Sequence, residues 1–407
     1  MSLSCRLCGH VLRDVFCDLG TSPLSNAYLT AEQLLQGETH FPLRTYVCRN
    51  CLLVQLPVFE APDAIFSDYA YFSSYSDSWL AHAREYSEEM ITELGLDGDC
   101  FVVEVASNDG YLLKNFVAHD IPVLGVEPAE NVASVARAAG VQTLVRFFGR
   151  SLADELAATR QADLIAANNV FAHVPDLDDF TAGLARLLAP TGVLTIEFPH
   201  LLRLIEQRQF DTIYHEHFSY FSLLTARRAL ERHKLVVYDV RELPTHGGSL
   251  RLYVCHEGAR QVKASVAALG QQEARARLDR IEPYLEFDAE VQLVKRELLK
   301  FLIGAREQGK VVVGYGAPAK GNTLLNYCGV RTDMIAFTVD RSPHKQGRYL
   351  PGSRIAIHDP EEIRLSRPDF VLILPWNLKE EIAEQLSFVR EWGGRLAVPI
   401  PSLEILE

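Results

Sequence analysis

The chain has 407 residues, 48% of them hydrophobic and 23% charged, which is enough for two or three globular domains that each bury a core. Its formal net charge of -13 argues against nucleic acid or an anionic membrane as the main partner. The sequence lacks a long apolar run of the kind that spans a bilayer, and its first residues lack the pattern of a secretion signal. We therefore expect a cytoplasmic protein without a membrane partner.

Two CxxC pairs stand near the amino terminus, at Cys5 and Cys8 and at Cys48 and Cys51. In a reducing compartment such pairs indicate metal or redox chemistry instead of disulfides. Four converging thiolates suit Zn²⁺, and a site with four protein ligands is closed and structural. The flanking residues favour β-structure, so we predict a zinc ribbon-like domain, with residues 22–26 as a loop between the pairs. A redox role is the alternative.

An aromatic segment follows at residues 66–79, with Tyr69, Tyr71 and Tyr75 among serines. One interpretation is a packing strip at a domain junction. The other is a lid that supplies phenol groups to a ligand pocket. A helix is expected next, at about 78–95.

Residues 100–257 alternate strand and helix patterns. This alternation predicts a doubly wound, mostly parallel sheet with a late antiparallel strand, and ligands of such sheets bind outside the carboxyl ends of the strands. The expected strands are 101–105, 122–126, 163–167, 192–197, 235–239 and 250–255.

The stretch 101–113, FVVEVASNDGYLL, is predicted to be a strand, a tight loop and the start of a helix. Such a loop directs backbone N–H groups and a helix N-terminus at a ligand. It lacks the GxGxxG pattern of dinucleotide loops. Its acidic residue followed by a turn of small residues resembles motif I of the class I S-adenosylmethionine methyltransferases. A plain strand–turn–helix without ligand is the alternative.

Two further strand ends carry polar residues. Glu127, with Pro128 after it, ends the second strand, where a carboxylate can accept both hydroxyls of a ribose. Asn168, Asn169 and His173 follow a later strand, at the place where a methyltransferase holds the methionine end of its donor. Surface and packing roles are the alternatives for Glu127 and His173.

The segment 210–222, FDTIYHEHFSYFS, contains Tyr214, His215, Glu216 and His217 in succession. A histidine such as His217 can act as a general base near neutral pH, and a carboxylate can orient it. A tyrosine can donate a hydrogen bond to an oxygen that becomes an enolate. The alternatives are a polar hairpin tip and a second metal site built from the two histidines.

The remaining sequence predicts a helical bridge and a second, smaller Rossmann-like unit. His246 precedes paired glycines that permit close backbone approach. Residues 259–309 favour two or three helices with a break near 282–283, the second at about 286–308. Strands are expected at 310–316, 335–339, 369–374 and 395–399. The loop GYGAPAKG is not a Walker loop, but its backbone and Lys320 are able to seat phosphates; a degenerate unit used as a lid is the alternative.

Taken together, the two CxxC pairs, VEVASNDGYLL, IYHEHFSYFS, THGGSLR and GYGAPAKGNTLLNY make the whole chain resemble the nucleotide-sugar C-methyltransferases. The resemblance implies an α/β protein in three parts. These are a zinc ribbon-like domain (1–70), a class I methyltransferase domain of Rossmann-like fold (71–257), and a helical bridge with a smaller Rossmann-like domain for the nucleotide sugar (258–407). One departure is Ala106, where many methyltransferases have glycine.

The resemblance further implies S-adenosylmethionine as methyl donor, structural zinc, and a dTDP-linked 4-keto-6-deoxy sugar methylated at C3, or at C5 in some relatives. We expect a monomer or weak oligomer. The alternatives are an O- or N-methyltransferase on a nucleotide sugar, and a zinc-ribbon adaptor that only binds ligands. The expected site residues are catalytic His217, Glu216, Tyr214 and Tyr75; cofactor-binding Glu104, Ala106, Ser107, Asn108, Gly110, Tyr111, Glu127, Pro128 and Asn169; substrate-binding Tyr71, His173, His246 and Lys320; and metal-binding Cys5, Cys8, Cys48 and Cys51.

Overall fold

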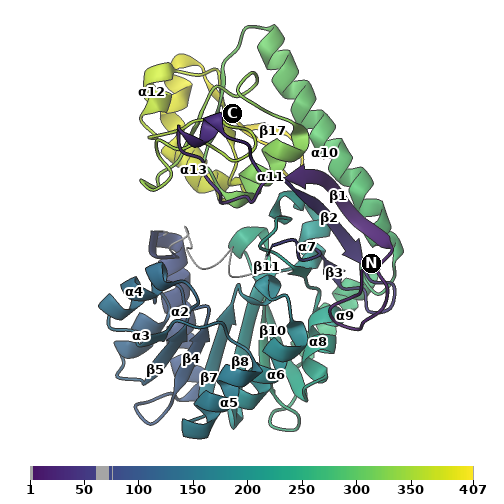
Figure 1. The fold of residues 1–407 in the computed structure, drawn as a ribbon, viewed down its shortest axis with the longest axis vertical. Coiled ribbons are helices and arrows are strands. Elements are labelled where there is room, and N and C mark those ends of the chain that lie inside the picture. Colours follow the sequence, from purple (N-terminus) through teal and green to yellow (C-terminus); the bar gives the residue numbers. More distant parts are fainter. Residues whose placement is uncertain (1–2, 61–72, 76, 407) are drawn as a thin grey trace.

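A computed structural model describes residues 3–60, 73–75 and 77–406 of the chain. Three β-sheets organise them: an antiparallel sheet, a seven-stranded sheet and a six-stranded sheet. Figure 1 shows the seven-stranded sheet in the lower lobe and the six-stranded sheet in the upper lobe, with the antiparallel sheet beside the long helix that joins them. Within the described ranges, helices of the length and apolarity needed to cross a bilayer are absent.

The antiparallel sheet combines amino-terminal strands with one strand from the middle of the chain. Its order is β1 (Asp14–Ser22), β2 (Phe41–Val47), β3 (Val54–Gln55) and β9 (Ser219–Tyr220). Inner positions such as Phe16 are fully buried, and the Phe16 ring stacks 4.6 Å from that of Phe287 on the long helix α10 (Glu282–Glu307). The amino-terminal part is thus packed on the rest of the molecule through an apolar core.

The seven-stranded sheet has the order β10-β11-β8-β7-β4-β5-β6, parallel throughout except for β11, which runs antiparallel to both neighbours. All four residues of β4 are buried, as expected for a central strand covered on both faces. The strand β6 was not predicted, because its two residues carry too little pattern to be recognised. The strands are β4 (Val102–Val105), β5 (Val123–Val126), β6 (Thr143–Leu144), β7 (Ala162–Asn168), β8 (Leu188–Pro199), β10 (Leu235–Leu243) and β11 (Ser249–His256).

Helices cover this sheet, and two of them begin at side-chain caps. Asp176 accepts a hydrogen bond from the backbone N–H of Asp179, and Ser222 forms a capping box with Thr225. The helices are α2 (Asp77–Leu94), α3 (Leu113–Val117), α4 (Glu130–Ala138), α5 (Arg150–Thr159), α6 (Leu177–Leu187), α7 (Leu201–Glu206) and α8 (Leu223–Glu231). Short 3-10 turns lie in the connecting segments: η2 (Ser73–Tyr75), η3 (Phe171–His173), η4 (Phe210–Thr212) and η5 (Thr245–Gly247).

Two helices, α9 (Ala264–Arg275) and α10, connect the lobes. The second begins at Glu282, earlier than expected, because Pro283 occupies its first turn, where a missing N–H costs no hydrogen bond. The six-stranded sheet follows in the order β14-β13-β12-β15-β16-β17, parallel except for β17. Its strands are β12 (Val312–Tyr315), β13 (Thr338–Val339), β14 (Ile357–His358), β15 (Phe370–Ile373), β16 (Arg395–Val398) and β17 (Glu404–Leu406), and its helices are α11 (Ala319–Cys328), α12 (Glu362–Ser366) and α13 (Lys379–Gln385).

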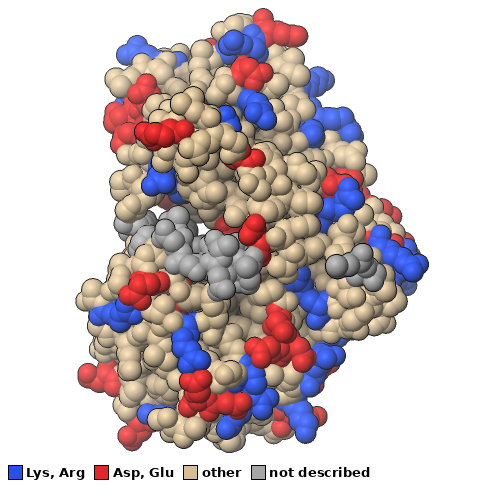
Figure 2. All heavy atoms as spheres, in the orientation of Figure 1, with Lys and Arg blue, Asp and Glu red and all other residues tan. Residues whose placement is uncertain are grey.

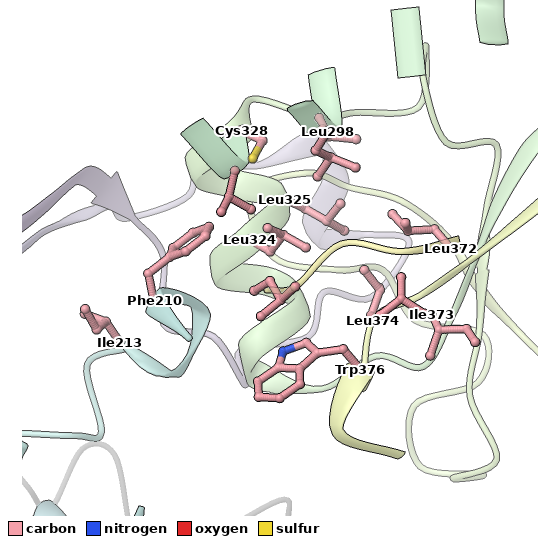
Figure 3. Close-up of a cluster of buried hydrophobic side chains, with 14 of the residues drawn as sticks. Phe210, Ile213, Leu298, Leu324, Leu325, Cys328, Leu372, Ile373, Leu374 and Trp376 are labelled. Atoms are coloured by element: carbon pink, nitrogen blue, oxygen red, sulfur yellow. The ribbon is translucent and has the colours of Figure 1, made fainter. Parts of the chain in front are cut away.

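The lobes share one apolar core at the junction shown in Figure 3. Phe210 of the central part points toward α11, which carries Leu324 and Leu325, and Ile213 belongs to the same apolar cluster (Figure 3). The indole N–H of Trp376 in the carboxyl-terminal part donates to Asp211 Oδ2 at 2.7 Å. This junction fixes the segment that leads into Tyr214 against the second lobe.

Candidate active site

A cavity of about 1060 Å³ lies at the carboxyl ends of the parallel strands β4, β5 and β7. All three parts of the chain line it: Asn26 from the amino-terminal part, the loops of the central sheet, and Lys320 and Asn377 from the carboxyl-terminal part. Figure 2 shows the molecule hollowed between its two lobes. A pocket at strand ends is where a doubly wound sheet holds ligands.

The loop after β4 turns sharply before α3 begins at Leu113. Ala106, Asn108 and Gly110 all have positive φ angles, of 60°, 48° and 77°. A Cβ atom on Gly110 would lie 3.1 Å from side-chain atoms of Ala136 and Val141, so the loop packs too closely for a larger residue. The expected strand, loop and helix are therefore present, and the loop faces the cavity through Ala106, Asn108 and Tyr111.

Glu127 at the end of β5 also lines the cavity, and the loop holds its carboxylate in place. The backbone N–H of Asn108 donates to Oε2 at 3.0 Å, and that of Ala129 donates to Oε1 at 2.9 Å. Burial raises the pKa of Glu127, and the two N–H groups oppose that rise. Each carboxylate oxygen keeps a second lone pair, which suits it to accept a ribose hydroxyl.

The expected cofactor residues divide into those that reach the cavity and those that lie beneath it. Ala106, Asn108, Tyr111, Glu127, Pro128 and Asn169 line the cavity, whereas Glu104, Ser107 and Gly110 do not. Glu104 is 1% exposed, and burial raises its pKa well above the ordinary value, with Asp109 and Glu127 adding to the rise. Glu104 therefore lies buried beneath the loop and does not reach the cavity.

Asn169, at the end of β7, is suited to a polar ligand. Both atoms of its side-chain amide are buried, and within the described part of the chain neither has a hydrogen-bond partner. A buried amide without partners is costly unless a ligand supplies them. Because Asn169 borders the same cavity as Glu127, the residues present fit a donor with a ribose at one end and polar groups at the other.

The same loop anchors the segment before α2. Asn108 Oδ1 accepts the backbone N–H of Ser73, and Asp109 Oδ2 accepts that of Ser74, both at 3.0 Å. Of the expected tyrosines, Tyr71 lies outside the described residues; Tyr75 ends η2, but its side chain also lies outside them. The aromatic segment 66–79 is described only from Ser73 onward, apart from residue 76.

Tyr214 and His217 form a hydrogen-bonded pair on the cavity wall. The hydroxyl of Tyr214 lies 2.9 Å from His217 Nε2, and His217 Nδ1 lies 2.9 Å from the carbonyl oxygen of Thr212. Because a carbonyl only accepts, Nδ1 carries the proton and Nε2 accepts from the tyrosine. Burial lowers the pKa of His217 well below 6.5, and His173 lowers it further. The imidazole is thus neutral and able to accept a proton.

The other members of the tetrad point in different directions. Glu216 lines the cavity and accepts a hydrogen bond of 2.6 Å from the amide of Asn26. His215 instead turns to the amino-terminal part, where its Nε2 lies 3.2 Å from the carbonyl oxygen of Pro42. His215 and His217 therefore do not converge, and the geometry does not support a metal site built from the pair.

The remaining expected substrate residues also line the cavity. The His173 ring lies edge-on to that of His217 with centroids 4.7 Å apart, and burial lowers the pKa of His173 to about 4. His246 sits at φ 55°, 5.2 Å from the Trp79 ring, and burial and then Lys320 lower its pKa to about 4. Lys320 donates to Asn377 Oδ1 at 2.8 Å, and burial lowers its pKa.

Sequence reasoning missed a charged network beside the cavity. Arg251 on β11 donates to Glu197 Oε2 on β8 at 2.9 Å, and the two side chains are 2% and 0% exposed. His82 of α2 lies 3.3 Å from the same oxygen, and Thr245 donates to Oε1 at 3.1 Å. Burial alone raises the pKa of Glu197, but hydrogen bonds from His82 and charge from Arg251 outweigh it and lower the pKa to about 2. The network fixes α2, which carries Trp79, against the sheet.

The two CxxC pairs converge as expected. The Sγ atoms of Cys5 and Cys51 lie 3.5 Å apart, as do those of Cys8 and Cys48, and all four lie within 4.8 Å of one another. Tetrahedral Zn²⁺ with Zn–S bonds of about 2.3 Å places its sulfur atoms roughly 3.8 Å apart, so the four thiolates fit zinc. With four protein ligands the site has no position for substrate and is structural.

Fold and site together define a class I methyltransferase that uses S-adenosylmethionine and carries a four-cysteine zinc site. Three family models match the chain: "Putative zinc binding domain" over residues 5–66, "Methyltransferase domain" over 79–240 and "C-methyltransferase C-terminal domain" over 244–401. The chain is 39% identical to C-methyltransferase NovU of Streptomyces niveus over 409 aligned residues, which cover 99% of this chain and 96% of that protein. The chain belongs to this C-methyltransferase family.

Solved structures match part of the chain at low identity. An S-adenosylmethionine-dependent methyltransferase from Clostridium acetobutylicum shares 13% identity, with a TM-score of 0.35, over 43% of this chain and 91% of its own. Magnesium protoporphyrin IX methyltransferase from Synechocystis, with bound SAH, shares 13% identity, with a TM-score of 0.35, over 44% of this chain and 83% of its own.

Proposed function

We propose that the protein methylates C3 of a nucleotide-linked 4-keto-6-deoxy sugar, a dTDP sugar first among candidates, through an enolate formed by His217. The observation that carries the proposal is the Tyr214–His217 pair, which lies on the wall of the cavity that Glu127 and Asn169 also line. Carbon becomes a nucleophile only when a proton next to a ketone is removed. A neutral imidazole with a tyrosine hydroxyl beside it supplies both functions that this step needs.

The donor side of the cavity is formed by the loop 106–111, Glu127 and Asn169. In the proposal, Glu127 accepts the ribose hydroxyls of S-adenosylmethionine, and the amide of Asn169 binds its polar end. The donor supplies an electrophilic methyl group when bound. The protein's contribution is to hold that group in line with the sugar carbon, since proximity and alignment lower the barrier.

His217 and Tyr214 divide the proton chemistry between them. Without substrate, the Tyr214 hydroxyl occupies the lone pair of Nε2. When a ketone enters, the hydroxyl can turn to the ketone oxygen, which frees Nε2 to accept the proton from the adjacent carbon. The hydroxyl then stabilises the enolate oxygen. The carbonyl of Thr212 keeps the proton on Nδ1 throughout and so holds the productive tautomer.

The carboxyl-terminal part offers groups for the nucleotide diphosphate. Lys320 lies in the first turn of the ten-residue helix α11 and reaches the cavity, as does Lys345. A helix N-terminus with lysines nearby favours anions. We assign His173 and His246 to the sugar, because both line the cavity, His173 against the ring of His217 and His246 against that of Trp79. In this proposal residues 258–407 bind the nucleotide.

The proposal is tested with purified protein, S-adenosylmethionine and dTDP-4-keto-6-deoxy sugars in D₂O. We expect exchange of the proton next to the ketone, a gain of one methyl group by mass, and an NMR signal for a methyl on C3. A methyl on oxygen or nitrogen would reject carbon methylation. A methyl on C5 would support carbon methylation through an enolate but would replace C3 by C5 as the carbon methylated. Absence of both exchange and transfer across the sugars would reject the function.

A further inference from the structure

Asn26 belongs to the loop between the two CxxC pairs and lies far from the tetrad in sequence, yet its amide donates to Glu216 Oε1 at 2.6 Å. We propose that Asn26 is a positioning residue that aims Glu216 into the cavity, so that the zinc-binding part of the chain completes the active site. The inference rests on the proposed function, because it assigns Glu216 a part in catalysis.

The direction of this hydrogen bond is settled by chemistry. A carboxylate oxygen only accepts, so the nitrogen of the Asn26 amide faces Glu216 and the oxygen faces away. That oxygen lies 3.3 Å from the hydroxyl of Tyr28, which itself donates to the carbonyl oxygen of Ala317 at 2.6 Å. Tyr28 is buried, and Lys345 also donates to the Ala317 carbonyl, at 2.9 Å. Asn26 therefore has a fixed neighbour on each side.

One helix of the carboxyl-terminal part holds both partners in register. Asn322 of α11 donates to the carbonyl oxygen of Ser25 at 2.6 Å, immediately before Asn26. The next residue, Thr323, donates to the carbonyl oxygen of Ile213 at 3.1 Å, immediately before Tyr214. Both hydrogen bonds are buried. Successive residues of α11 thus fix the two chain segments that carry Asn26 and the tetrad.

The far end of the tetrad is held by the zinc-binding part as well. Tyr220 and Ser219 of β9 pair with Val54 and Gln55 of β3, soon after the second CxxC pair. The Gln55 amide also donates to Cys5 Sγ at 3.1 Å. Segment 214–220 is therefore bracketed, with α11 before it and the zinc-linked strand after it. Glu216 sits between these anchors, and Asn26 donates a hydrogen bond to its side chain.

The consequence of losing Asn26 follows from the burial of Glu216, which is 5% exposed. A buried carboxylate deprived of a hydrogen bond moves toward another donor or toward water. A charge-assisted hydrogen bond of this kind is worth roughly a tenfold effect or more. An Asn26→Asp change is harsher, since it sets a second carboxylate against the first.

The test is a double-mutant cycle of Asn26→Ala and Glu216→Ala, read as kcat for methyl transfer and as melting temperature. We expect Asn26→Ala to lower kcat about tenfold or more in the wild type, with unchanged S-adenosylmethionine affinity by calorimetry. In the Glu216→Ala background the same change should cost less than about twofold. Asn26→Asp should lose more activity than Asn26→Ala.

Asn326→Ala is the matched control. Asn326 lies on the same helix α11, outside the cavity, and the change removes amide hydrogen bonds to the carbonyl oxygens of Asn322 on that helix and of Pro351 in a later turn. Its effects should be small on kcat and additive with Glu216→Ala. Equal losses of kcat from Asn26→Ala in both backgrounds would overturn the inference.

The melting temperatures give a readout that needs no substrate. Coupled effects of the Asn26 and Glu216 changes support the contact, and additive effects overturn it. If the wild-type protein methylates no nucleotide sugar, the proposed function fails, while this cycle still decides whether Asn26 acts through Glu216.

Discussion

The Tyr214 hydroxyl and His217 Nε2 are 2.9 Å apart, and the opposite ring nitrogen of His217 faces the Thr212 carbonyl. His217 is thereby held as a single neutral tautomer, and the lone pair of its Nε2 accepts the hydroxyl of Tyr214. The arrangement keeps the imidazole neutral in a buried site without leaving its acceptor atom unpaired.

Removing either partner of this pair should separate binding from chemistry. We expect His217→Ala to lower kcat by roughly 10²-fold or more, the scale of general-base catalysis, while S-adenosylmethionine binding is retained. Tyr214→Phe should lower kcat by roughly 10-fold to 10²-fold, because it removes the enolate donor but leaves the base. Steady-state kinetics and calorimetry measure the two effects. Tyr349→Phe, outside the cavity, is the control, and retained activity in His217→Ala would remove His217 from the mechanism.

The acid limb of the pH profile should lie below the ordinary histidine range. Burial, His173, His246 and Lys320 all lower the pKa of His217, so the imidazole stays neutral and able to accept a proton below pH 6.5. We expect kcat/KM to hold through pH 6.5 and to fall only at lower pH. A midpoint at or above pH 6.5 would contradict this assignment. Protein stability must be checked in parallel by circular dichroism.

The buried histidines also predict how stability depends on pH. The pKa of His173 and of His246 falls from 6.5 to about 4 on folding, so the unfolded chain binds more protons between these values. Their contribution to stability is complete above pH 6.5 and is lost as the pH falls toward 4. Urea unfolding at several pH values should show this slope, and a His246→Asn variant should show a shallower one. An unchanged slope in that variant would refute the assignment for His246.

Chelation should test the structural role assigned to zinc. Because the site is closed, a chelator should lower the melting temperature by about 5 °C or more, yet leave activity intact in assays completed before the protein unfolds. Differential scanning fluorimetry and initial rates measure the two outcomes. Immediate inhibition of protein that is still folded would indicate instead that zinc takes part in the reaction.

The Arg251–Glu197 pair should be sensitive to loss of one partner. Arg251→Met removes the guanidinium partner of a fully buried carboxylate, which costs about 3–5 kcal/mol of unfolding free energy. The double variant Arg251→Met with Glu197→Gln should recover part of that loss. Arg241→Ala, which breaks the more exposed pair with Glu89, is the comparison and should cost less than about 1 kcal/mol. Equal losses of unfolding free energy in Arg251→Met and Arg241→Ala would argue that burial of the pair does not determine its contribution to stability.

The sequence allowed part of the cavity wall to be predicted, because the carboxyl ends of parallel strands meet at one sheet edge. Glu127 and Asn169 are placed by that rule alone. The direction in which each side chain of an irregular segment points was not predictable. His215 turns to the carbonyl oxygen of Pro42, whereas His217 faces the cavity and Tyr214. Asn26 looked like an ordinary loop residue, because its partner lies in a distant segment. Trp79 and His82 occur in a helix whose pattern gives no sign of a ligand.

The antiparallel sheet takes its first three strands from the amino-terminal part, the last of which ends at Gln55. Its fourth strand, β9, consists of residues 219–220 from the central part. During synthesis the edge of β3 therefore stays unpaired until residues 219–220 have been made and can pair with it. Exchanging residues 1–60 between relatives would combine β3 of one protein with β9 of another. A chimaera that keeps its own β9 partner should fold more efficiently than one cut between the two.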